Sequence, residues 1–297
     1  MYLLIGDDRD PCIAGVGAHL RARGKRVVVT TMPLSDDCRF AWRLDKNVSS
    51  SRTHFITGEG ETVSNNDWRG VLVRSFGESA ESGGWNADDL AYVQTETQAA
   101  LIAWLKSLSC LVINPPLAEN WFRPHRTLPE QQTMFARAGL PTLASIVTND
   151  PIAARKFVGR WNGNATYTPL TSPLRYQINN DSQWQELEKV MTQIPVCLVE
   201  PLPESTVRAT YVNGEMVWAE SIELDDTQRC RLIEGMRRLA RLSQLELFQI
   251  ELLVKRGEAR CVSFNGFVQV AFHNEAEREQ ISCRMAEMLI EGKGGSQ

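Results

Sequence analysis

One acidic side chain in the second half of the chain lies in a segment that is predicted to be buried, where a charged group is energetically unfavourable. Glu251 interrupts the apolar run Phe248–Val254, which has the composition of a buried strand. Burying a carboxylate is unfavourable unless a cation or several hydrogen-bond donors compensate its charge. Glu251 is therefore predicted to take part in a site, either as a metal ligand or as half of an ion pair.

Three other polar side chains stand beside predicted strands, and each has two interpretations. Arg208 starts a predicted hairpin and could bind a phosphate or another anion, or be a solvated strand arginine. Asn265 precedes Gly266 and is either a ligand amide or a turn residue. Arg74 closes an apolar strand at its carboxyl end, where α/β folds bind ligands, so it either faces a substrate or caps the sheet.

The clearest local signal is the hairpin that carries Arg208. The alternating segments Val207–Val212 and Met216–Ser221 flank an Asn-Gly pair, which suits a two-residue turn with positive φ. A second strand pair is predicted at Phe248–Val254 and Arg260–Phe264. These four strands would position Arg208, Glu251 and Asn265.

The N-terminal part has the pattern of a parallel α/β unit. Strand Tyr2–Ile5, a helix over residues 12–24 and strand Lys25–Thr30 form a βαβ opening, whereas residues 35–70 are polar and rich in turn formers. Strand Val71–Val73, helix Ala87–Ser107 and strand Cys110–Asn114 follow. The Pro-Pro pair at 115 and 116 predicts a boundary between a domain at residues 1–115 and a domain at residues 116–297.

The second domain is predicted to mix helices and strands. The first helix predicted in this domain has Pro129 in its first turn, where proline is favourable. Besides the four strands above, helices are expected at 127–138, Ile152–Val158, Ser182–Gln193, Thr227–Leu242 and Glu275–Ile290, and strands at Thr142–Val147, Ala165–Tyr167, Leu174–Ile178 and Val196–Val199.

Composition and charge exclude several classes of protein. The chain has 32 Lys and Arg against 36 Asp and Glu, so no basic excess favours binding to nucleic acid. No apolar run approaches the ~20 residues of a membrane-spanning helix. The N-terminus lacks a basic leader followed by a long apolar stretch, and we expect no signal peptide and a cytoplasmic location.

Metal and dinucleotide motifs are also missing from the sequence. The seven cysteines are scattered with no CxxC spacing, and the four histidines are isolated, so a zinc site is not expected. Buried reduced thiols are the ordinary interpretation of such cysteines. Gly15 and Gly17 in the first helix do not complete a G-x-G-x-x-G fingerprint.

From residue 112 onward, the order of segments resembles the ATP-grasp superfamily, most of all the microviridin-type ligases that cross-link peptides. The resemblance implies an N-terminal parallel-sheet α/β domain followed by an ATP-grasp fold. The matching stretches are Asn114-Pro115-Pro116-Leu117, Gly139-Leu140-Pro141-Thr142, Val147-Thr148-Asn149-Asp150-Pro151 with Ala153-Ala154, Leu198-Val199-Glu200-Pro201-Leu202-Pro203 running into Val207-Arg208, the Asn213-Gly214 hairpin, and Phe248 to Asn265.

The resemblance also implies a chemistry and the residues that serve it. An ATP-grasp ligase phosphorylates a carboxylate with ATP and Mg²⁺, and a nucleophile then attacks the acylphosphate. By position, Arg126 replaces the first phosphate-binding lysine and Glu200 is the acidic residue of the adenine hinge. Arg208 matches the hairpin arginine that stabilises the transferred phosphoryl group, and Glu251 and Asn265 match metal ligands.

This sequence departs from the family pattern at two charged positions. Thr168 stands where the second phosphate-binding lysine is expected, and a threonine supplies no charge. The family's Glu-x-Asn on the closing strand reads Ser263-Phe264-Asn265, so the bridging carboxylate is missing. A magnesium–triphosphate site with one carboxylate and one amide is undercharged, which predicts that ATP and Mg²⁺ binding is weakened or lost.

Two alternatives to these assignments stay open. The alignment with the family could shift by a residue or two, which would change each match. Other side chains could also replace the missing charges: Lys156 or Lys255 for the lysine, and Glu220, Glu223 or Asp225 for the carboxylate.

Two functional hypotheses follow. The first is a non-catalytic ATP-grasp homologue, a pseudoenzyme that binds a peptide or a partner enzyme. The second is an ATP-dependent carboxylate–amine or carboxylate–alcohol ligase that modifies a peptide. Positions 168 and 263 favour the first, whereas Arg208, Glu251 and Asn265 favour the second. The expected partner is a peptide or protein rather than nucleic acid or membrane, and a homodimer is a further candidate.

Overall fold

The computed structural model describes most of the chain and divides it into two compact units. The described residues are 1–30, 39–43, 52–56, 62–64, 68–74, 86–115, 126–172, 174–203, 206–219, 224–255 and 257–292. The first unit comprises Met1–Phe122, Gln244–Leu247 and Gly266–Gln297, and the second comprises Arg123–Ser243 and Phe248–Asn265. The domain boundary predicted after residue 115 stays a prediction; the C-terminal helix shares a unit with the N-terminal strands.

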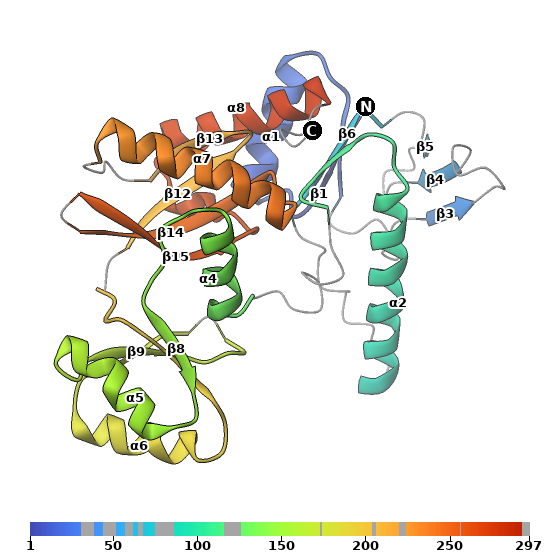
Figure 1. The fold of residues 1–297 in the computed structure, drawn as a ribbon. Coiled ribbons are helices and arrows are strands. Elements are labelled where there is room, and N and C mark those ends of the chain that lie inside the picture. Colours follow the sequence, from blue (N-terminus) through green and yellow to red (C-terminus); the bar gives the residue numbers. More distant parts are fainter. Residues whose placement is uncertain are drawn as a thin grey trace. The chain divides into compact units, whose positions relative to one another are not determined.

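The first unit is built on a four-stranded parallel sheet with the order β2-β1-β6-β7. The predicted α/β class is confirmed, with helices α1, α2 and α8 in the same unit (Figure 1). The bounds are β1 Tyr2–Ile5, α1 Pro11–Ala22, β2 Val27–Thr30, β6 Gly70–Val73, α2 Ala87–Lys106, β7 Leu111–Ile113 and α8 Glu275–Glu291, with a short 3₁₀ turn at Val270–Phe272.

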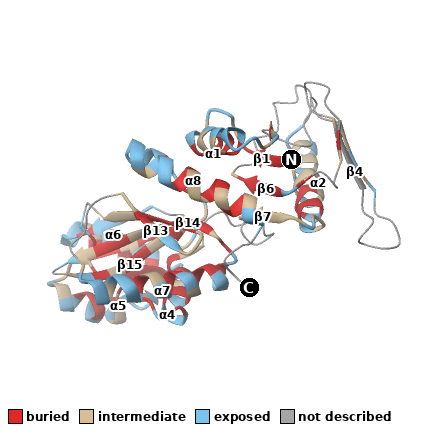
Figure 2. Cartoon of the chain, turned by 90° about the horizontal axis from the view of Figure 1, so that it is seen from above, coloured by how far each residue is buried: buried red, intermediate tan, exposed pale blue. Residues whose placement is uncertain are grey.

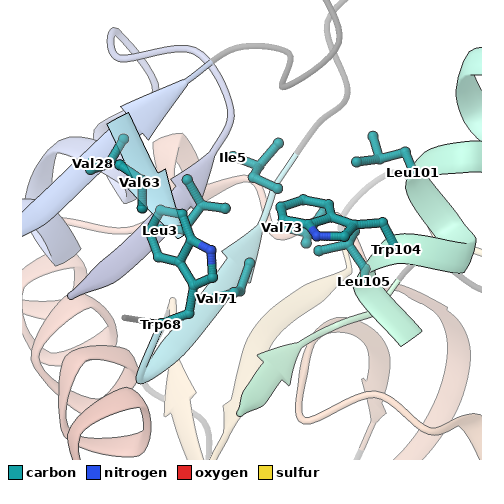
Figure 3. Close-up of a cluster of buried hydrophobic side chains, with 10 residues drawn as sticks. All are labelled: Leu3, Ile5, Val28, Val63, Trp68, Val71, Val73, Leu101, Trp104 and Leu105. Carbon is teal, nitrogen blue, oxygen red and sulfur yellow. The ribbon is translucent and has the colours of Figure 1, made fainter. Parts of the chain in front are cut away.

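Strand periodicity creates the core of this unit. Alternate residues of β1 and β6 point to one face of the sheet and meet apolar side chains of α2, including the fully buried Trp104 (Figure 3). The cluster also receives Val28, Val63 and Trp68. Both faces of β1 and β6 are buried, and α2 packs on the face that Leu3, Ile5, Val71 and Val73 share.

Helices α1 and α8 contact each other closely because of a glycine. A Cβ atom at Gly15 would lie 2.4 Å from Oγ of Ser282 on α8, so a larger residue would push the helices apart. Gly70 in β6 plays a similar part, since a Cβ there would lie 2.9 Å from the Leu289 side chain. Gly15 and Gly70 are therefore explained by close packing rather than by nucleotide binding.

Residues 35–70, which were predicted to be polar turns, contain strands. An antiparallel sheet of order β3-β4-β5 comprises Arg39–Arg43, Arg52–Ile56 and Thr62–Ser64. The prediction was wrong here because these strands are short and carry several polar residues. Phe40 packs edge-on against Trp104, with 5.3 Å between ring centroids, so the sheet contributes to the core of the first unit.

The second unit contains one antiparallel sheet of order β10-β9-β11-β8 with two helices. Apolar residues of α5 and α6 pack on one face of this sheet, in a cluster that includes Phe157, Trp184 and Leu198. The bounds are β8 Ser145–Thr148, α5 Pro151–Val158, β9 Ala165–Thr168, β10 Tyr176–Ile178, α6 Asp181–Met191 and β11 Val196–Val199, with a 3₁₀ turn at Gly159–Trp161.

A second antiparallel sheet, of order β13-β12-β14-β15, carries the predicted hairpins. Asn213 and Gly214 both have positive φ, as the predicted turn requires. Helices α4 and α7 belong to the same unit as this sheet, and they contact each other (Figure 1). The bounds are α4 Leu128–Arg137, β12 Val207–Val212, β13 Glu215–Trp218, α7 Asp226–Ser243, β14 Leu247–Lys255 and β15 Glu258–Asn265.

The β14–β15 hairpin has one apolar face. Phe248 stacks on Tyr211 with 4.7 Å between centroids, and Phe264 contacts both Phe248 and Phe135 of α4. Figure 2 shows that buried residues concentrate on the strands of both units. The other face of the hairpin carries the polar side chains that sequence analysis singled out. No helix within the described residues is long and apolar enough to cross a membrane.

Candidate functional site

A β-bulge in the β14–β15 hairpin sets which side chains share the polar face. Glu251 pairs with Ser263, and the register shifts between Glu251 and Leu252. After the shift Leu253 pairs with Arg260, so Arg260 and Ser263 both share the face of Glu251 although they are three residues apart. The bulge thus adds an arginine to the face that carries the predicted metal ligand.

The predicted metal ligands Glu251 and Asn265 lie on this same face. Asn265 pairs with Gln249, which is two residues from Glu251 on β14. Ser263 lies between them on β15, at the position where the resemblance implies a bridging carboxylate. The structure therefore brings Glu251, Ser263 and Asn265 together, whereas the metal-binding roles of Glu251 and Asn265 stay predictions.

The Glu251 carboxylate already accepts hydrogen bonds on both oxygens. Oε2 accepts from Nη2 of Arg175 at 2.5 Å and from Oγ of Ser263 at 2.8 Å. Oε1 accepts from Oγ1 of Thr206 at 2.8 Å, and Nη2 of Arg208 lies 3.9 Å from the same oxygen. Of the two sequence interpretations, the structure shows an ion pair.

These donors control the protonation of Glu251. Burial favours the neutral acid, but the Arg175 charge and hydrogen bond, together with the Ser263 and Thr206 hydroxyls, outweigh it and lower the pKa of Glu251. The carboxylate is therefore ionised at neutral pH. The positive charge that balances it belongs to an arginine of the same chain.

The predicted hinge residue Glu200 forms a second ion pair. It is buried, directly after β11, and both carboxylate oxygens accept from Nη1 of Arg260, at 2.5 and 2.6 Å. Its backbone N–H donates to the carbonyl of Ala144. Glu200 thus contacts the closing hairpin through Arg260, and its predicted role toward adenine stays a prediction.

The two positions at which the resemblance implies phosphate-binding lysines are Arg126 and Thr168, and they differ in their surroundings. Nη1 of Arg126 lies 3.3 Å from the Glu130 carboxylate and 3.4 Å from the sulfur of Met134, so these contacts lie on α4. Thr168 is buried in β9, and its hydroxyl has no hydrogen-bond partner within the described part of the chain. Arg126 as a phosphate ligand stays a prediction.

The alternative replacements considered from the sequence lie elsewhere or outside the described residues. Lys156 is exposed on α5 and Lys255 is exposed at the end of β14. Asp225 accepts a hydrogen bond from the backbone N–H of Gln228 at the start of α7. Glu220 and Glu223 lie outside the described residues.

The side chains around Glu251 do not fit a magnesium ion. Mg²⁺ needs oxygen lone pairs from carboxylates, amides or water in an octahedral arrangement. Here a guanidinium and two hydroxyls donate to the one carboxylate, and the hydroxyl of Ser263 stands where the resemblance implies a second carboxylate. Among the described residues, no group of three or more His, Cys, Asp or Glu could hold a metal ion.

Two buried glutamines of α4 hold the strand that carries Ser263. Nε2 of Gln132 donates to the carbonyls of Cys261 and Val262, which lie at the bulge. Oε1 of Gln131 accepts from the backbone N–H of Phe264. These bonds satisfy backbone groups of β15, which lies at the edge of its sheet. The sequence analysis did not single out either glutamine, because an isolated Gln-Gln pair in a helix has no distinctive spacing.

Arg175 is a candidate site residue that nothing in the sequence singles out. It precedes β10 and is 76 residues from Glu251 in the sequence. No motif surrounds it, and the only available signal was the need of Glu251 for a cation. This requirement does not predict which arginine or lysine of the chain pairs with Glu251.

Arg74 proves to be structural. Its Nε donates to Oδ2 of Asp10 at 3.0 Å, and its Nη2 donates to the carbonyl of Val268 at 2.6 Å. Oδ1 of Asp10 accepts from the backbone N–H of Cys12 and so caps α1. The interpretation of Arg74 as a cap of the sheet agrees with these contacts, all of which lie in the first unit.

Comparison with solved structures identifies the fold. The macrocyclase MdnC of Microcystis aeruginosa MRC, solved with its precursor peptide MdnA, aligns with a TM-score of 0.77 and 14% identity, covering 98% of this chain and 99% of MdnC. The chain has the ATP-grasp fold. A RiPP-associated ATP-grasp ligase of Chryseobacterium gregarium, solved with ADP and a leader and core peptide, aligns with a TM-score of 0.76 and 15% identity, covering 98% and 96%.

A third ATP-grasp structure shares a little more of the sequence. The ligase PsnB, complexed with a minimal precursor, Mg and ADP, aligns with a TM-score of 0.71 and 22% identity, covering 98% of this chain and 97% of PsnB. The resemblance noted from the sequence is thus confirmed at the level of the fold. No protein-family model and no curated protein matches the chain.

Proposed function

We propose that this chain is a non-catalytic ATP-grasp homologue that binds a peptide or a partner enzyme. The observation that carries the proposal is the ion pair between Glu251 and Arg175, which supplies from within the chain the cation that a ligase takes from Mg²⁺. A magnesium ion would have to displace three donors from a carboxylate whose charge is already balanced.

Two further positions support the loss of nucleotide chemistry. Thr168 supplies no charge where the resemblance implies a lysine, and Ser263 donates to Glu251 where a second carboxylate is implied. Each missing group of this kind costs about 2.7–4 kcal/mol of transition-state stabilisation in comparable electrostatic sites. Two such losses reduce the rate of phosphoryl transfer by several orders of magnitude.

A peptide is the favoured partner because of what the structural neighbours bind. MdnC, PsnB and the Chryseobacterium gregarium ligase are each described in complex with a precursor, leader or core peptide. A pseudoenzyme that keeps the fold and loses the metal site would retain surfaces for a partner of this class. A second copy of the chain is a further candidate partner.

The alternative function is an ATP-dependent carboxylate–amine or carboxylate–alcohol ligase that modifies a peptide. Arg208 supports it, since this arginine matches the hairpin arginine and lies 3.9 Å from Glu251. Asn265 shares the same face. PsnB and the Chryseobacterium gregarium ligase have been solved with ADP, and PsnB also with Mg.

A nucleotide titration decides between the two functions. The purified chain is titrated with ATP and Mg²⁺ by calorimetry, and its melting temperature is followed in parallel, since a ligand that binds only the native state raises it. We expect neither heat nor a thermal shift at millimolar ATP. Tight, magnesium-dependent binding would overturn the proposal and favour the ligase.

A matched variant makes the same titration sensitive to the ion pair. In Arg175→Met/Ser263→Glu the internal cation is removed and a second carboxylate is restored beside Glu251. We expect this variant to bind ATP more tightly with Mg²⁺ than without it. Arg155→Met, which removes an exposed ion pair with Glu188, is the control and should behave like the wild type.

Peptide binding needs its own measurement. A peptide-display selection on the immobilised chain should enrich a sequence whose affinity is unchanged by ATP and Mg²⁺. Failure to enrich any sequence would contradict the peptide-binding half of the proposal. Mass photometry of the free chain shows at the same time whether it forms a homodimer.

A further inference from the structure

Two arginine–carboxylate pairs connect the two sheets of the second unit. Arg175, directly before β10, pairs with Glu251 of β14 at 2.5 Å. Glu200, directly after β11, pairs with Arg260 of β15, also at 2.5 Å. β10 and β11 belong to one sheet, and β14 and β15 to the other. Each ion pair therefore spans the sheets rather than joining neighbours on one strand.

The two pairs reach the hairpin on the same face and enclose apolar side chains. The bulge places Arg260 on the face of Glu251. Leu253 and Val262 of the hairpin lie in one buried cluster with Cys197 and Val199 of β11. This apolar cluster lowers the local dielectric beside the ion pairs, which are only partly exposed, and so strengthens their electrostatic attraction.

The charges alternate between the sheets. The sheet of β10 and β11 contributes the cation Arg175 and the anion Glu200, whereas the hairpin contributes the anion Glu251 and the cation Arg260. The Glu200 side chain is 6% exposed and that of Glu251 is 18% exposed. Separating the sheets would break both charge-assisted pairs and expose the apolar cluster between the sheets to water, which is unfavourable.

We propose that the Arg175–Glu251 and Arg260–Glu200 pairs act together as a clamp that holds the two sheets closed without a nucleotide. The inference deepens the proposed function, because a chain that no longer binds ATP needs its own groups to hold the sheets together. The clamp would keep a partner-binding surface formed at all times.

The thiol of Cys197 reports on the clamp directly. Cys197 is fully buried within the apolar cluster that both sheets form, so it becomes accessible to alkylation only when the sheets separate or the unit unfolds. Cys12 is equally buried in the first unit, and burial raises the pKa of each of these two thiols to about 11. Cys12 is therefore an internal control for global unfolding.

The experiment measures iodoacetamide alkylation of both cysteines in the native full chain by mass spectrometry. Arg175→Met and Arg260→Met each remove one pair, and Arg155→Met removes a pair that joins α5 and α6 of the same subdomain. We expect each clamp variant to speed alkylation of Cys197 about tenfold, the factor for losing about 1.4 kcal/mol of charged hydrogen bonding. Alkylation of Cys12 should be unchanged, and Arg155→Met should match the wild type.

Two outcomes would overturn the clamp. One is an unchanged rate at Cys197 in both clamp variants. The other is equal acceleration at Cys197 and Cys12, which would mean that the pairs stabilise the chain as a whole. If Arg175→Met does not fold, Glu251→Gln breaks the same ion pair by removing the charge of the carboxylate while keeping the shape of the side chain, and it is expected to speed alkylation of Cys197 only.

This result is independent of the nucleotide titration. Tight ATP binding with slow wild-type alkylation and fast alkylation in the clamp variants would contradict the proposed function and leave the clamp intact. Absence of ATP binding with equal alkylation in all variants would contradict the clamp and leave the proposed function intact.

Discussion

The two units each contain a partly buried arginine–carboxylate pair beside a strand end, and the two pairs differ in what they connect. In the first unit, Arg74 follows β6 and pairs with Asp10 at 3.0 Å. In the second unit, Arg175 precedes β10 and pairs with Glu251 at 2.5 Å. From the sequence alone, Arg74 and Glu251 were both candidates for a ligand site.

The atoms of the first pair are used by local structure. Asp10 caps α1 with its second oxygen, and Arg74 binds the carbonyl of Val268 with a second nitrogen. This pair links the β1–α1 connection, the end of β6 and the segment before α8 inside one unit. Its geometry needs no ligand.

The second pair connects two sheets at the polar face of a hairpin. Glu251 lies on an otherwise apolar strand, beside Ser263 and Asn265 on the neighbouring strand. The comparison teaches that an ion pair is informative about function when it lies on a face that the fold leaves polar. A pair that also caps a helix and binds a backbone carbonyl is explained by structure alone.

The largest expected effect tests the first pair. Arg74→Met leaves the Asp10 carboxylate and the Val268 carbonyl without their donor, in a place where the Arg74 side chain is only 9% exposed. We expect the free energy of unfolding to fall by about 3 kcal/mol. Urea denaturation followed by circular dichroism measures it. Arg9→Met, which removes an exposed pair with Asp7, should not change the free energy of unfolding. An equal fall in both variants would show that the Arg74–Asp10 pair contributes no more than an exposed ion pair.

The next effect tests the second pair and depends on pH. Glu251→Gln removes the charge that Arg175 and two hydroxyls stabilise, and should lower the free energy of unfolding by about 2 kcal/mol at pH 7. Because the pKa of Glu251 is lower in the folded chain than in the unfolded chain, its contribution is complete above the unfolded pKa. The contribution is lost as the pH falls through the folded pKa.

The measurement compares denaturation of the wild type and Glu251→Gln across acidic and neutral pH. The difference in the free energy of unfolding between the two proteins should shrink in acid, and it should stay constant above the pKa that Glu251 has in the unfolded chain. A difference that does not depend on pH would mean that shape or packing, and not charge, explains the loss. Asp10→Asn at the first pair provides the matched comparison.

The smallest expected effect separates the hydroxyl from the ion pair. Ser263→Ala removes one hydrogen bond to Glu251 and one from Arg175, and both groups keep each other as partners. We expect a loss of about 1 kcal/mol in the free energy of unfolding. A double-mutant cycle with Glu251→Gln measures the coupling. Additive losses would show that Ser263 does not act through Glu251.

The sequence determined much of the local structure. Alternation and an Asn-Gly turn predicted the hairpin around Asn213, and short apolar runs predicted the parallel strands of the first unit, because these signals depend on neighbouring residues. The burial of Glu251 in an apolar strand predicted that it needs a metal ion or a cation. The order of short motifs was enough to suggest the ATP-grasp fold.

Only the tertiary structure decided which cation meets Glu251 and which residues share its face. Arg175 is 76 residues away from Glu251 in the sequence. Arg260 shares the face of Glu251 only because of a β-bulge, and no sequence motif predicts that bulge. The short strands within residues 35–70 and the placement of α8 in the first unit were equally hidden. The physical reason is the same in each case: a periodic pattern states that a side chain must be buried or paired, whereas its partner depends on how distant segments pack.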